Sequence, residues 1–323
     1  MYCRITVSPE LEAPGISAGV NVRFRYWEYG KNGLGSGMNN APATASPAHS
    51  HAFLGTSHVL GMIYLMDRDG KRQWDYPLAA PQDVWMLPNG HLLATWRHGV
   101  KEITPAKTVV WEYTVADPHE VPTCQPLPGG NVMIGIVGEC RLVEVNRQGE
   151  ILHELKLATT EKTPHAQFRM CRRTSAGTYL VPFTAEGAVR EYDRDGRCLR
   201  QFPPMAAPVC ALRLPDGNTL ITGNGGVSEF DGGDRLLWRL DLAADFPDVQ
   251  AGVPAGVQRL PNGNTVFCNW GSRTRGQQRG VSILEVTPDK RLVWQVAADG
   301  LEQVAQCQLL TPGLKPRAEL VLR

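Results

Sequence analysis

The chain has 323 residues, of which 42% are hydrophobic and 20% are charged, and its 33 Lys and Arg almost balance its 32 Asp and Glu. This is the composition of an ordinary globular protein that is long enough for a full core. A formal net charge of +1 without basic or acidic blocks argues against nucleic acid or an anionic membrane as partner. The longest apolar run, Val59 to Met66, is too short to span a membrane.

Residues 1–50 show neither strand nor helix periodicity, and Gly, Pro, Ser and Asn crowd the stretch from Gly30 to Ser50. We therefore expect a disordered N-terminal arm over 1–50 and a single domain over 51–323. The start contains Glu10 and Glu12 where a secretory signal needs a basic and then an apolar stretch. This predicts a cytoplasmic protein. A start at Met38 would also supply no signal peptide. If the N-terminus is assigned wrongly, a periplasmic or secreted location is the alternative.

A short strand, a tight turn and a second strand recur along the rest of the chain. Pro presets the first dihedral of such a turn, and Gly accepts the positive one that follows. The copies are VWMLPNGHLLAT, CQPLPGGNVMIG, CRRTSAGTYLVP, ALRLPDGNTLIT and VQRLPNGNTVFC, which begin at Val84, Cys124, Cys171, Ala211 and Val257.

A second hairpin pattern alternates with the first and has six copies. The last residues of its turns are 37 to 56 residues apart, a period that suits a unit of four short antiparallel strands. Four residues after each of these turn ends stand Trp74, Trp111, His153, Arg200, Trp238 and Trp294. Because the tryptophans belong to the repeat itself, we expect them to pack between units and not to bind ligand.

These alternating hairpins, without a convincing helix between them, predict an all-β fold, a six-bladed β-propeller of four-stranded antiparallel blades. The segment 53–56 resembles a second strand that has no first strand before it, whereas 304–310 resembles a first strand without a full unit after it. N- and C-terminal strands should therefore complete one blade and close the ring. Residues 319–322 compete with 53–56 for the second place in that blade.

The eight cysteines are spread along the chain without a CxxC pair, so zinc ribbons and thioredoxin chemistry have no support. Cys124, Cys171 and Cys307 occupy the same place in three repeats, where Val84 and Ala211 stand in others. This substitution pattern indicates reduced packing residues. A disulfide or a reactive thiol is the alternative.

The outer hairpin resembles the PQQ-like repeat of bacterial quinoproteins, in which an Asp, a turn Gly and a Trp recur, as Asp67, Gly70 and Trp74 do here. The resemblance covers residues 52–323. LPNGN and the following Asn269-Trp270-Gly271 are also similar to arylsulfotransferase-type six-bladed propellers, whose preceding His-Asp pair is here Ala255-Gly256. With six repeats instead of eight and no adjacent cysteine pair, we expect no bound quinone and no other cofactor. The strongest resemblance, to uncharacterised bacterial PQQ-like propellers, implies a fold and no agreed activity.

The two faces of the predicted disc differ. One carries the short, repetitive turns, and the other carries the long polar connections, where binding groups usually lie. Polar side chains that enter the inner strands on this second face could hold a polyhydroxylated or anionic small molecule at the mouth of the central channel. We expect the ligand-binding residues to be Gln82, Asp83, Gln167, Gln258, Asn269, Trp270, Gln303 and Gln306.

Two pairs at this mouth are candidate catalytic residues. His165 with Arg169 combines a titratable base and an anion anchor, and His119 with Glu120 forms an acid–base or metal-ligating pair. The alternatives are a solvent-facing His165, an Arg169 that only packs, and loop hydrogen bonds for His119-Glu120.

Three further segments are weaker candidates. Trp270 with Arg273, Arg275 and Arg279 could stack on a sugar and hold its acid group, and Trp96-Arg97-His98 suggests the same combination. The HSH sequence ending at His51 is a weak metal motif.

The favoured function is recognition of a small polar ligand, carbohydrate-derived or anionic. The first alternative is a lyase or hydrolase that acts on a sugar-type substrate, with a divalent metal as an option. The second is a protein-interaction scaffold. Because propellers support unrelated functions, the fold does not decide among them.

Overall fold

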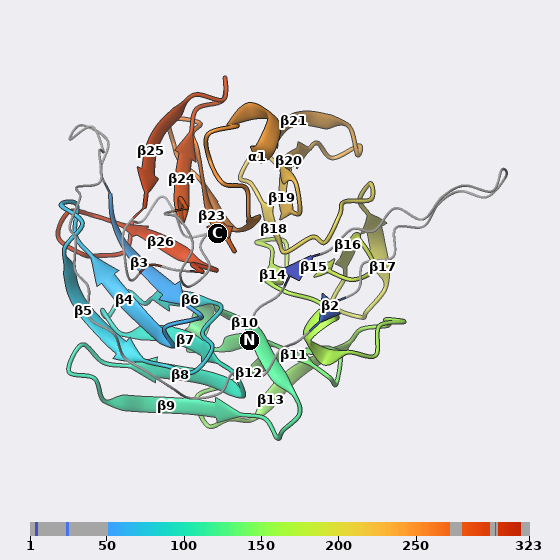
Figure 1. Cartoon of the computed structure of the whole chain (residues 1–323). Helices are drawn as coiled ribbons and strands as arrows, with labels where there is room; N and C mark the ends of the chain where they lie inside the picture. Colours follow the sequence, from blue (N-terminus) through green and yellow to red (C-terminus); the bar gives the residue numbers. More distant parts are fainter. Residues whose placement is uncertain are drawn as a thin grey trace, which may run out of the picture. The chain divides into compact units, whose positions relative to one another are not determined.

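Six four-stranded antiparallel sheets are arranged in a ring (Figure 1). The computed structural model describes residues 51–271, 280–297, 301 and 303–317, together with two short strands nearer the N-terminus. The chain divides into two units, Met1–Pro42 and Ala43–Arg323. In the first, β1 (Arg4–Ile5) pairs antiparallel with β2 (Phe24–Arg25). The rest of the predicted arm, 1–50, lies outside the described residues. The second unit contains the ring, which confirms the predicted propeller of six blades.

We number the blades from the one that contains β3. Blade 1 contains β26 (Cys307–Leu310), β3 (Ala52–Ser57), β4 (Met62–Met66) and β5 (Arg72–Pro77). Blade 2 contains β6 (Val84–Met86), β7 (Leu92–Trp96), β8 (Gly99–Ile103) and β9 (Val109–Thr114). Blade 3 contains β10 (Glu120–Pro126), β11 (Val132–Val137), β12 (Arg141–Val145) and β13 (Ile151–Lys156).

The other three blades follow the same order from the channel outward. Blade 4 contains β14 (Arg172–Arg173), β15 (Tyr179–Phe183), β16 (Ala188–Tyr192) and β17 (Cys198–Gln201). Blade 5 contains β18 (Cys210–Arg213), β19 (Thr219–Gly223), β20 (Gly226–Phe230) and β21 (Leu236–Asp241), followed by the short helix α1 (Leu242–Asp245). Blade 6 contains β22 (Val253–Arg259), β23 (Thr265–Trp270), β24 (Ile283–Val286) and β25 (Leu292–Val296).

Blade 1 is built from both ends of this unit, as predicted. The C-terminal strand β26 pairs antiparallel with β3, and the register joins Cys307 to Gly55 and Leu310 to Ala52. In Figure 1 the red β26 lies beside the blue β3. The second place in this blade therefore belongs to β3, and the competing segment 319–322 lies outside the described residues.

The turns between strands explain much of the repeat. Gly90 and Gly263 in the two Pro-Asn-Gly turns have φ of 83° and 84°, a region in which a side chain is strained. In the outer turns, the last residue also has positive φ, whether it is glycine, as Gly70 is, or Lys107 or Asp234.

Glutamates that are buried, or half-buried in the case of Glu191, connect neighbouring blades. In five blades the third strand carries a Glu. It is paired across the sheet with the fourth-strand residue that stands four positions after the outer turn, which is Trp, His or Arg. Each carboxylate reaches a basic residue of the next blade. We call these five the seam glutamates, and their pairs are Glu102–Arg147, Glu144–Arg173, Glu191–Arg213, Glu229–Arg259 and Glu285–His51.

The repeated tryptophans pack at the same junctions, as predicted. Trp74 Nε1 donates to the Pro105 carbonyl of the next blade at 2.8 Å, and Trp238 Nε1 donates to the Pro288 carbonyl at 2.8 Å. Trp294 meets the His51 ring edge-on, at 4.9 Å between centroids. These contacts make the tryptophans structural.

The described cysteines are free, and all except Cys198 are buried. The predicted packing role of Cys124, Cys171 and Cys307 is thus confirmed. Burial raises the pKa of the Cys171 thiol well above its ordinary value. Among the described residues, no helix has the length and apolar character that a membrane crossing requires.

Candidate functional site

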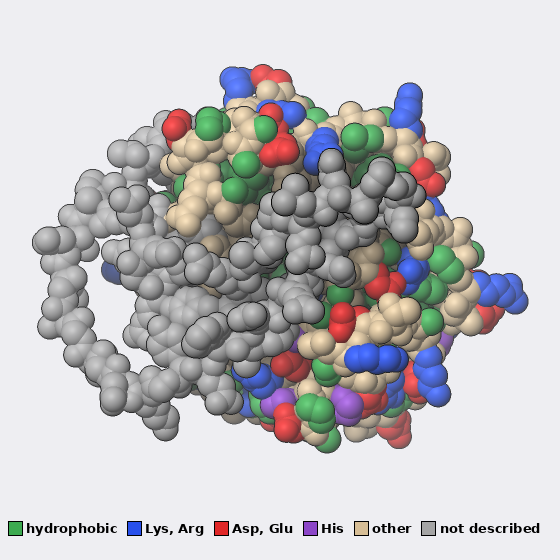
Figure 2. All heavy atoms as spheres, turned by 45° about the vertical axis from the view of Figure 1, so that its right-hand side comes forward, with side chains coloured by type: hydrophobic (Ala, Val, Ile, Leu, Met, Phe, Trp, Pro, Cys, Tyr) green, Lys and Arg blue, Asp and Glu red, His purple; other side chains and the backbone are tan. Residues whose placement is uncertain are grey.

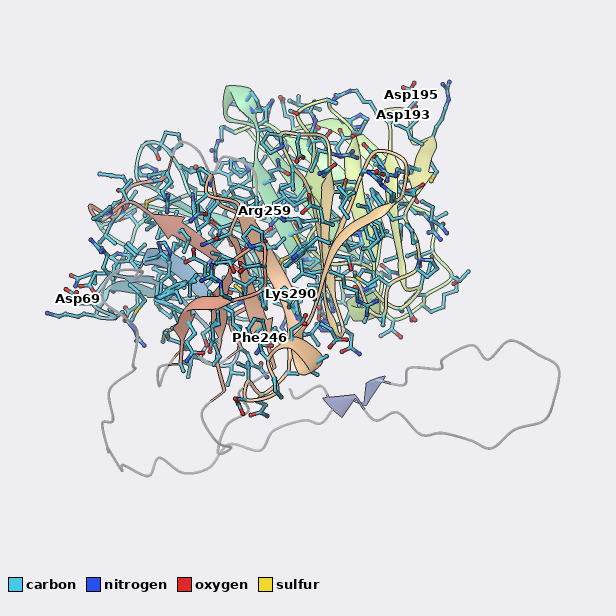
Figure 3. The ribbon with its side chains drawn as sticks, turned by 90° about the horizontal axis from the view of Figure 1, so that it is seen from above. Asp69, Asp193, Asp195, Phe246, Arg259 and Lys290 are labelled. Carbon is cyan, nitrogen blue, oxygen red and sulfur yellow. The ribbon has the colours of Figure 1, made fainter. Side chains whose placement is uncertain are left out.

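The alternation of strand direction divides the ring into two faces. Connections within the inner and outer hairpins form the turn face, and the second-to-third and blade-to-blade connections form the loop face. Figure 3 labels Asp193 and Asp195, in the turn between β16 and β17, and Phe246, which follows α1, at well-separated places. In Figure 2, positive and negative side chains are interspersed over the described surface that faces the viewer.

On the loop face, His165 and Glu120 meet across the seam between blades 3 and 4. His165 lies in a short 3-10 turn, Pro164–Ala166, and Glu120 begins β10. The distance from His165 Nδ1 to Glu120 Oε2 is 2.7 Å. Arg97, from the connection between β7 and β8, lies 3.5 Å from the other carboxylate oxygen of Glu120. The structure therefore joins His165, from the predicted His165–Arg169 pair, to Glu120, from the predicted His119–Glu120 pair.

Arg169 belongs to the same group. Its guanidinium donates hydrogen bonds to the carbonyls of His165 and Phe168, which hold it beside the histidine. Burial alone raises the pKa of Glu120, but its hydrogen bond with His165 and the charges of His165, Arg169 and Arg97 outweigh burial, so this pKa is lowered. Glu120 is therefore a stable carboxylate.

The electrostatics keep His165 neutral. Burial is the largest cause that lowers the pKa of His165, and the charge of Arg169 lowers it further, against the raising effect of Glu120. Since an ionised carboxylate only accepts hydrogen bonds, Nδ1–H of His165 donates to Glu120. The lone pair of the neutral ring is then on Nε2, as a general base requires.

The sequence did not single out His58, which follows β3 and joins this group. Burial first, and then the charges of His165, Arg97 and Arg169, lower the pKa of His58 to about 4. Its backbone N–H donates to the Gln303 carbonyl at 3.4 Å. We call His58, Arg97, Glu120, His165 and Arg169 the loop-face cluster. The only sequence signal for His58 was its position at the end of a strand, on the loop face.

His119 forms a separate pair. Its Nε2 lies 3.7 Å from Glu139 Oε1, and its buried Nδ1 has no hydrogen-bond partner in the described ranges of the chain. Glu139 is also bonded to Arg141. A side chain at Gly138 would contact the His119 ring, since an added Cβ would lie 2.4 Å from Nδ1. Thus His119 packs against the β11–β12 turn, whereas its neighbour Glu120 pairs with His165.

Asp83 is fully buried and pairs with Arg172 inside the ring. Arg172 Nη1 donates to Asp83 Oδ2 at 2.8 Å, and the backbone N–H of Cys124 donates to the same oxygen at 3.2 Å. The guanidinium also lies over the Trp85 ring, 5.2 Å from its centroid. This pair joins the inner strands of blades 2, 3 and 4, so Asp83 is placed as a structural residue.

Gln258 is buried, and its amide bonds to the next inner strand. Nε2 donates to the Cys307 carbonyl at 2.8 Å, and Oε1 accepts from the Leu309 N–H at 3.2 Å. Glutamines at the equivalent position of two other inner strands also bond to the next inner strand. Oε1 of Gln125 accepts from the Arg173 N–H, and Oε1 of Gln308 accepts from the Met86 N–H.

The amides of Gln167 and Gln306 also have partners within the protein. Gln167 Oε1 accepts from the Gly138 N–H at 2.7 Å. Gln306 Oε1 accepts from the Cys307 N–H at 3.0 Å, and its Nε2 lies 3.8 Å from Met170 Sδ. Gln82 is half-buried, and its backbone N–H donates to Thr95 Oγ1.

Three predicted residues remain. Asn269 is buried and bonds to the backbone of Gly252, Gln250 and Val281, while Trp270 packs against the cores on both sides of blade 6. Arg273, Arg275 and Arg279, predicted to act with Trp270, lie outside the described residues. Gln303 differs, because it is 4% exposed and its Oε1 has no hydrogen-bond partner among the described residues.

A metal centre finds no support in the part of the chain that the structure describes, where no group of three or more potential ligands comes together. His51, from the HSH sequence, bonds to Glu285 Oε2 at 2.7 Å.

The fold and the arrangement of its side chains define the class of protein: the chain is a six-bladed β-propeller. No protein-family model matches the sequence, and no curated protein matches it. A Bacteroides caccae protein of unknown function is similar in structure, with 25% identity and a TM-score of 0.73 over 81% of this chain and 99% of that one.

Lyases are also among the similar structures. A streptogramin B lyase shares 14% identity, with a TM-score of 0.56 over 79% of this chain and 81% of that one. A catalytically inactive virginiamycin B lyase from Staphylococcus aureus, solved with quinupristin, shares 15% identity, with a TM-score of 0.56 over 78% and 85%. At this identity, the likeness shows the fold alone.

Proposed function

We propose that the protein binds a small hydroxylated anion, such as a sugar acid, at the loop-face cluster. The observation that carries this proposal is the excess of positive groups there. Among the described residues of the cluster, two guanidiniums, Arg97 and Arg169, stand against one carboxylate, Glu120, and the two histidines beside them are neutral. A bound carboxylate or other oxyanion compensates this excess through charge-assisted hydrogen bonds.

Gln303 supports the hydroxylated part of the ligand. Its backbone carbonyl accepts the N–H of His58, so the residue adjoins the cluster. Its buried side-chain Oε1 has no hydrogen-bond partner within the part of the chain that the structure describes. An unpaired buried acceptor costs free energy, which a ligand O–H that donates to it recovers.

The experiment is isothermal titration of gluconate, galacturonate, glucose and hexanoate into the wild type and the Arg169→Gln variant. The two hydroxy acids should bind more tightly than the neutral sugar or the fatty acid, and Arg169→Gln should weaken them at least about tenfold. Arg235→Gln, on the turn face, is the matched control and should leave binding unchanged. Absence of binding by every compound contradicts the proposal and favours a protein partner.

A lyase is the second candidate, and the neutral His165 supports it. With Nδ1–H held by Glu120, Nε2 of His165 removes a proton from the carbon beside the ligand carboxylate. The electron pair of the broken C–H bond forms a C=C bond, and the C–O bond on the next carbon breaks. The protonated His165 then gives its proton to the leaving oxygen, which departs as an alcohol. The test is the ultraviolet absorbance of the unsaturated acid formed from oligouronates. His165→Gln should abolish its formation, while sugar-acid binding persists.

We also propose that the repeats are of the PQQ-like type and that the protein is cytoplasmic. The Asp67, Gly70 and Trp74 pattern supports the PQQ-like type of repeat. Gly70 ends the outer turn with positive φ, and Trp74 bonds to the Pro105 carbonyl of the next blade. The free thiols of the described cysteines fit a reducing compartment.

A further inference from the structure

A cavity lies on the turn face of blade 1, away from the loop-face cluster. It has a volume of about 320 Å³ and is lined by His51, Ala52, Arg68, Leu310, Thr311, Pro312 and Arg317. Among these described lining residues, two are arginines and one is a histidine, and none is acidic.

The composite construction of blade 1 explains why a cavity forms there. In the other blades one chain segment makes the inner hairpin. In blade 1, β26 ends at Leu310 and the chain turns back over Thr311–Lys315, but the second strand is β3, which enters at Ala52. Two chain segments, near His51 and near Arg317, therefore pass where a single turn lies elsewhere. The space between them and the β4–β5 turn is the cavity.

The positive charge of Arg68 is available in the cavity because of its neighbours in blades 1 and 6. The β4–β5 turn has the sequence Asp-Arg-Asp-Gly at 67–70, identical to 193–196 in blade 4. In blade 4, Arg194 reaches back to the seam glutamate of the preceding blade, Glu144, at 3.4 Å. The equivalent carboxylate for Arg68 is Glu285, which already bonds to His51 and to Asn264. Within the described residues, no ion pair or hydrogen bond involves the Arg68 side chain.

We propose that this cavity is a second binding site, which takes a small oxyanion with a short apolar body. Arg68 and the Thr311 hydroxyl are placed to bind the oxyanion, and Arg317 adds positive charge to the same wall. Ala52, Leu310 and Pro312 form the apolar wall. Such a ligand connects the incoming strand β3, the outgoing segment and the β4–β5 turn, so it stabilises the closure of the ring.

Inorganic phosphate and butyrate are the probes. We expect each to bind the wild type in an equilibrium titration at constant ionic strength, with butyrate tighter than acetate because of the apolar wall. Arg68→Gln should weaken both probes about tenfold or more, since it removes a charge-assisted hydrogen bond. The probes should also raise the melting temperature of the wild type, and less so that of Arg68→Gln.

Two control variants separate this site from other anion binding. Arg194→Gln changes the identical turn in blade 4 and should bind the probes as the wild type does. Arg169→Gln disables the loop-face cluster and should retain the Arg68-dependent binding. If Arg68→Gln binds the probes as well as Arg194→Gln does, or if Arg169→Gln abolishes all binding, the turn-face site is wrong. The proposal stands independently of the loop-face function.

Discussion

Arg172 and Asp83 form an ion pair that is shielded from water, with Arg172 Nη1 at 2.8 Å from Asp83 Oδ2 and side chains that are 2% and 0% exposed. The two residues come from blades 4 and 2, and Thr123 of blade 3 donates to the same carboxylate. In such surroundings the stability of each charged group depends on the other, because water cannot reach the group to solvate it in place of its partner.

Removal of one member of this pair should therefore be costly. Asp83→Asn leaves the Arg172 guanidinium buried without its counter-charge and should lower the free energy of unfolding by about 3–5 kcal/mol. The measurement is urea unfolding at neutral pH. The double variant Asp83→Leu/Arg172→Met should be more stable than Asp83→Asn, because it removes both charges. A single variant as stable as the wild type contradicts the assigned role.

Gln258 should matter for stability and not for ligand binding. Gln258→Leu leaves the Leu309 N–H and the Cys307 carbonyl without their partner and should cost about 1–3 kcal/mol of unfolding free energy. Gln82→Leu is the control, since its side chain is half-buried and should cost much less. If Gln258→Leu keeps full stability but loses sugar-acid binding, the amide faces ligand and not the neighbouring strand.

Glu144 is a seam glutamate with three partners in the next blade. It forms an ion pair with Arg173 and accepts hydrogen bonds from Arg194 and from the Tyr179 hydroxyl. Glu144→Ala should lower the unfolding free energy by about 2–4 kcal/mol because it leaves buried donors unpaired. Thermal unfolding tests this against Glu112→Ala, which changes a carboxylate on the outer strand β9. Equal melting temperatures for the two variants exclude the role of the seam glutamate.

His58 should make stability depend on pH. Its pKa is about 4 in the folded protein against 6.5 ordinarily, mainly because of burial, so the unfolded chain binds more protons between these values. Stability should then fall as the pH falls from 6.5 towards 4, by up to about 3 kcal/mol from this group. His58→Gln should lose less stability than the wild type between pH 7 and pH 5 in urea unfolding. Parallel pH profiles for the two proteins show that His58 titrates normally.

The repeat predicted the fold because its signals are local. Turn prolines and glycines and strand alternation at a fixed period require only neighbouring residues, so the six blades and the closing strands follow from the sequence. The seam glutamates stand at the centre of KEI, VEV, REY, SEF and LEV, one in each of five outer hairpins, but this position alone does not predict their role. Their burial depends on basic residues in the next blade, such as Arg213 and Arg259, and the spacing within one hairpin does not show these partners.

The loop-face cluster combines residues far apart in sequence, which limited its prediction. His165, Glu120 and Arg169 were identified as loop-face polar groups, but their pairing depends on the packing of blade 3 against blade 4. Most of the predicted glutamines and Asp83 proved to be bonded within the protein. A polar residue at the start of an inner strand can face either the channel or the next blade, and sequence alone does not distinguish the two.

The composite blade has a consequence for how the molecule is made. The hydrogen bonds between Thr56 and Gln306 join residues 250 positions apart, so this pairing has a very high contact order. A ribosome synthesises β3 first among the ring strands and β26 last. During synthesis, one edge of β3 therefore lacks its strand partner, and the nascent chain depends on its final segment to protect that edge from pairing with other chains.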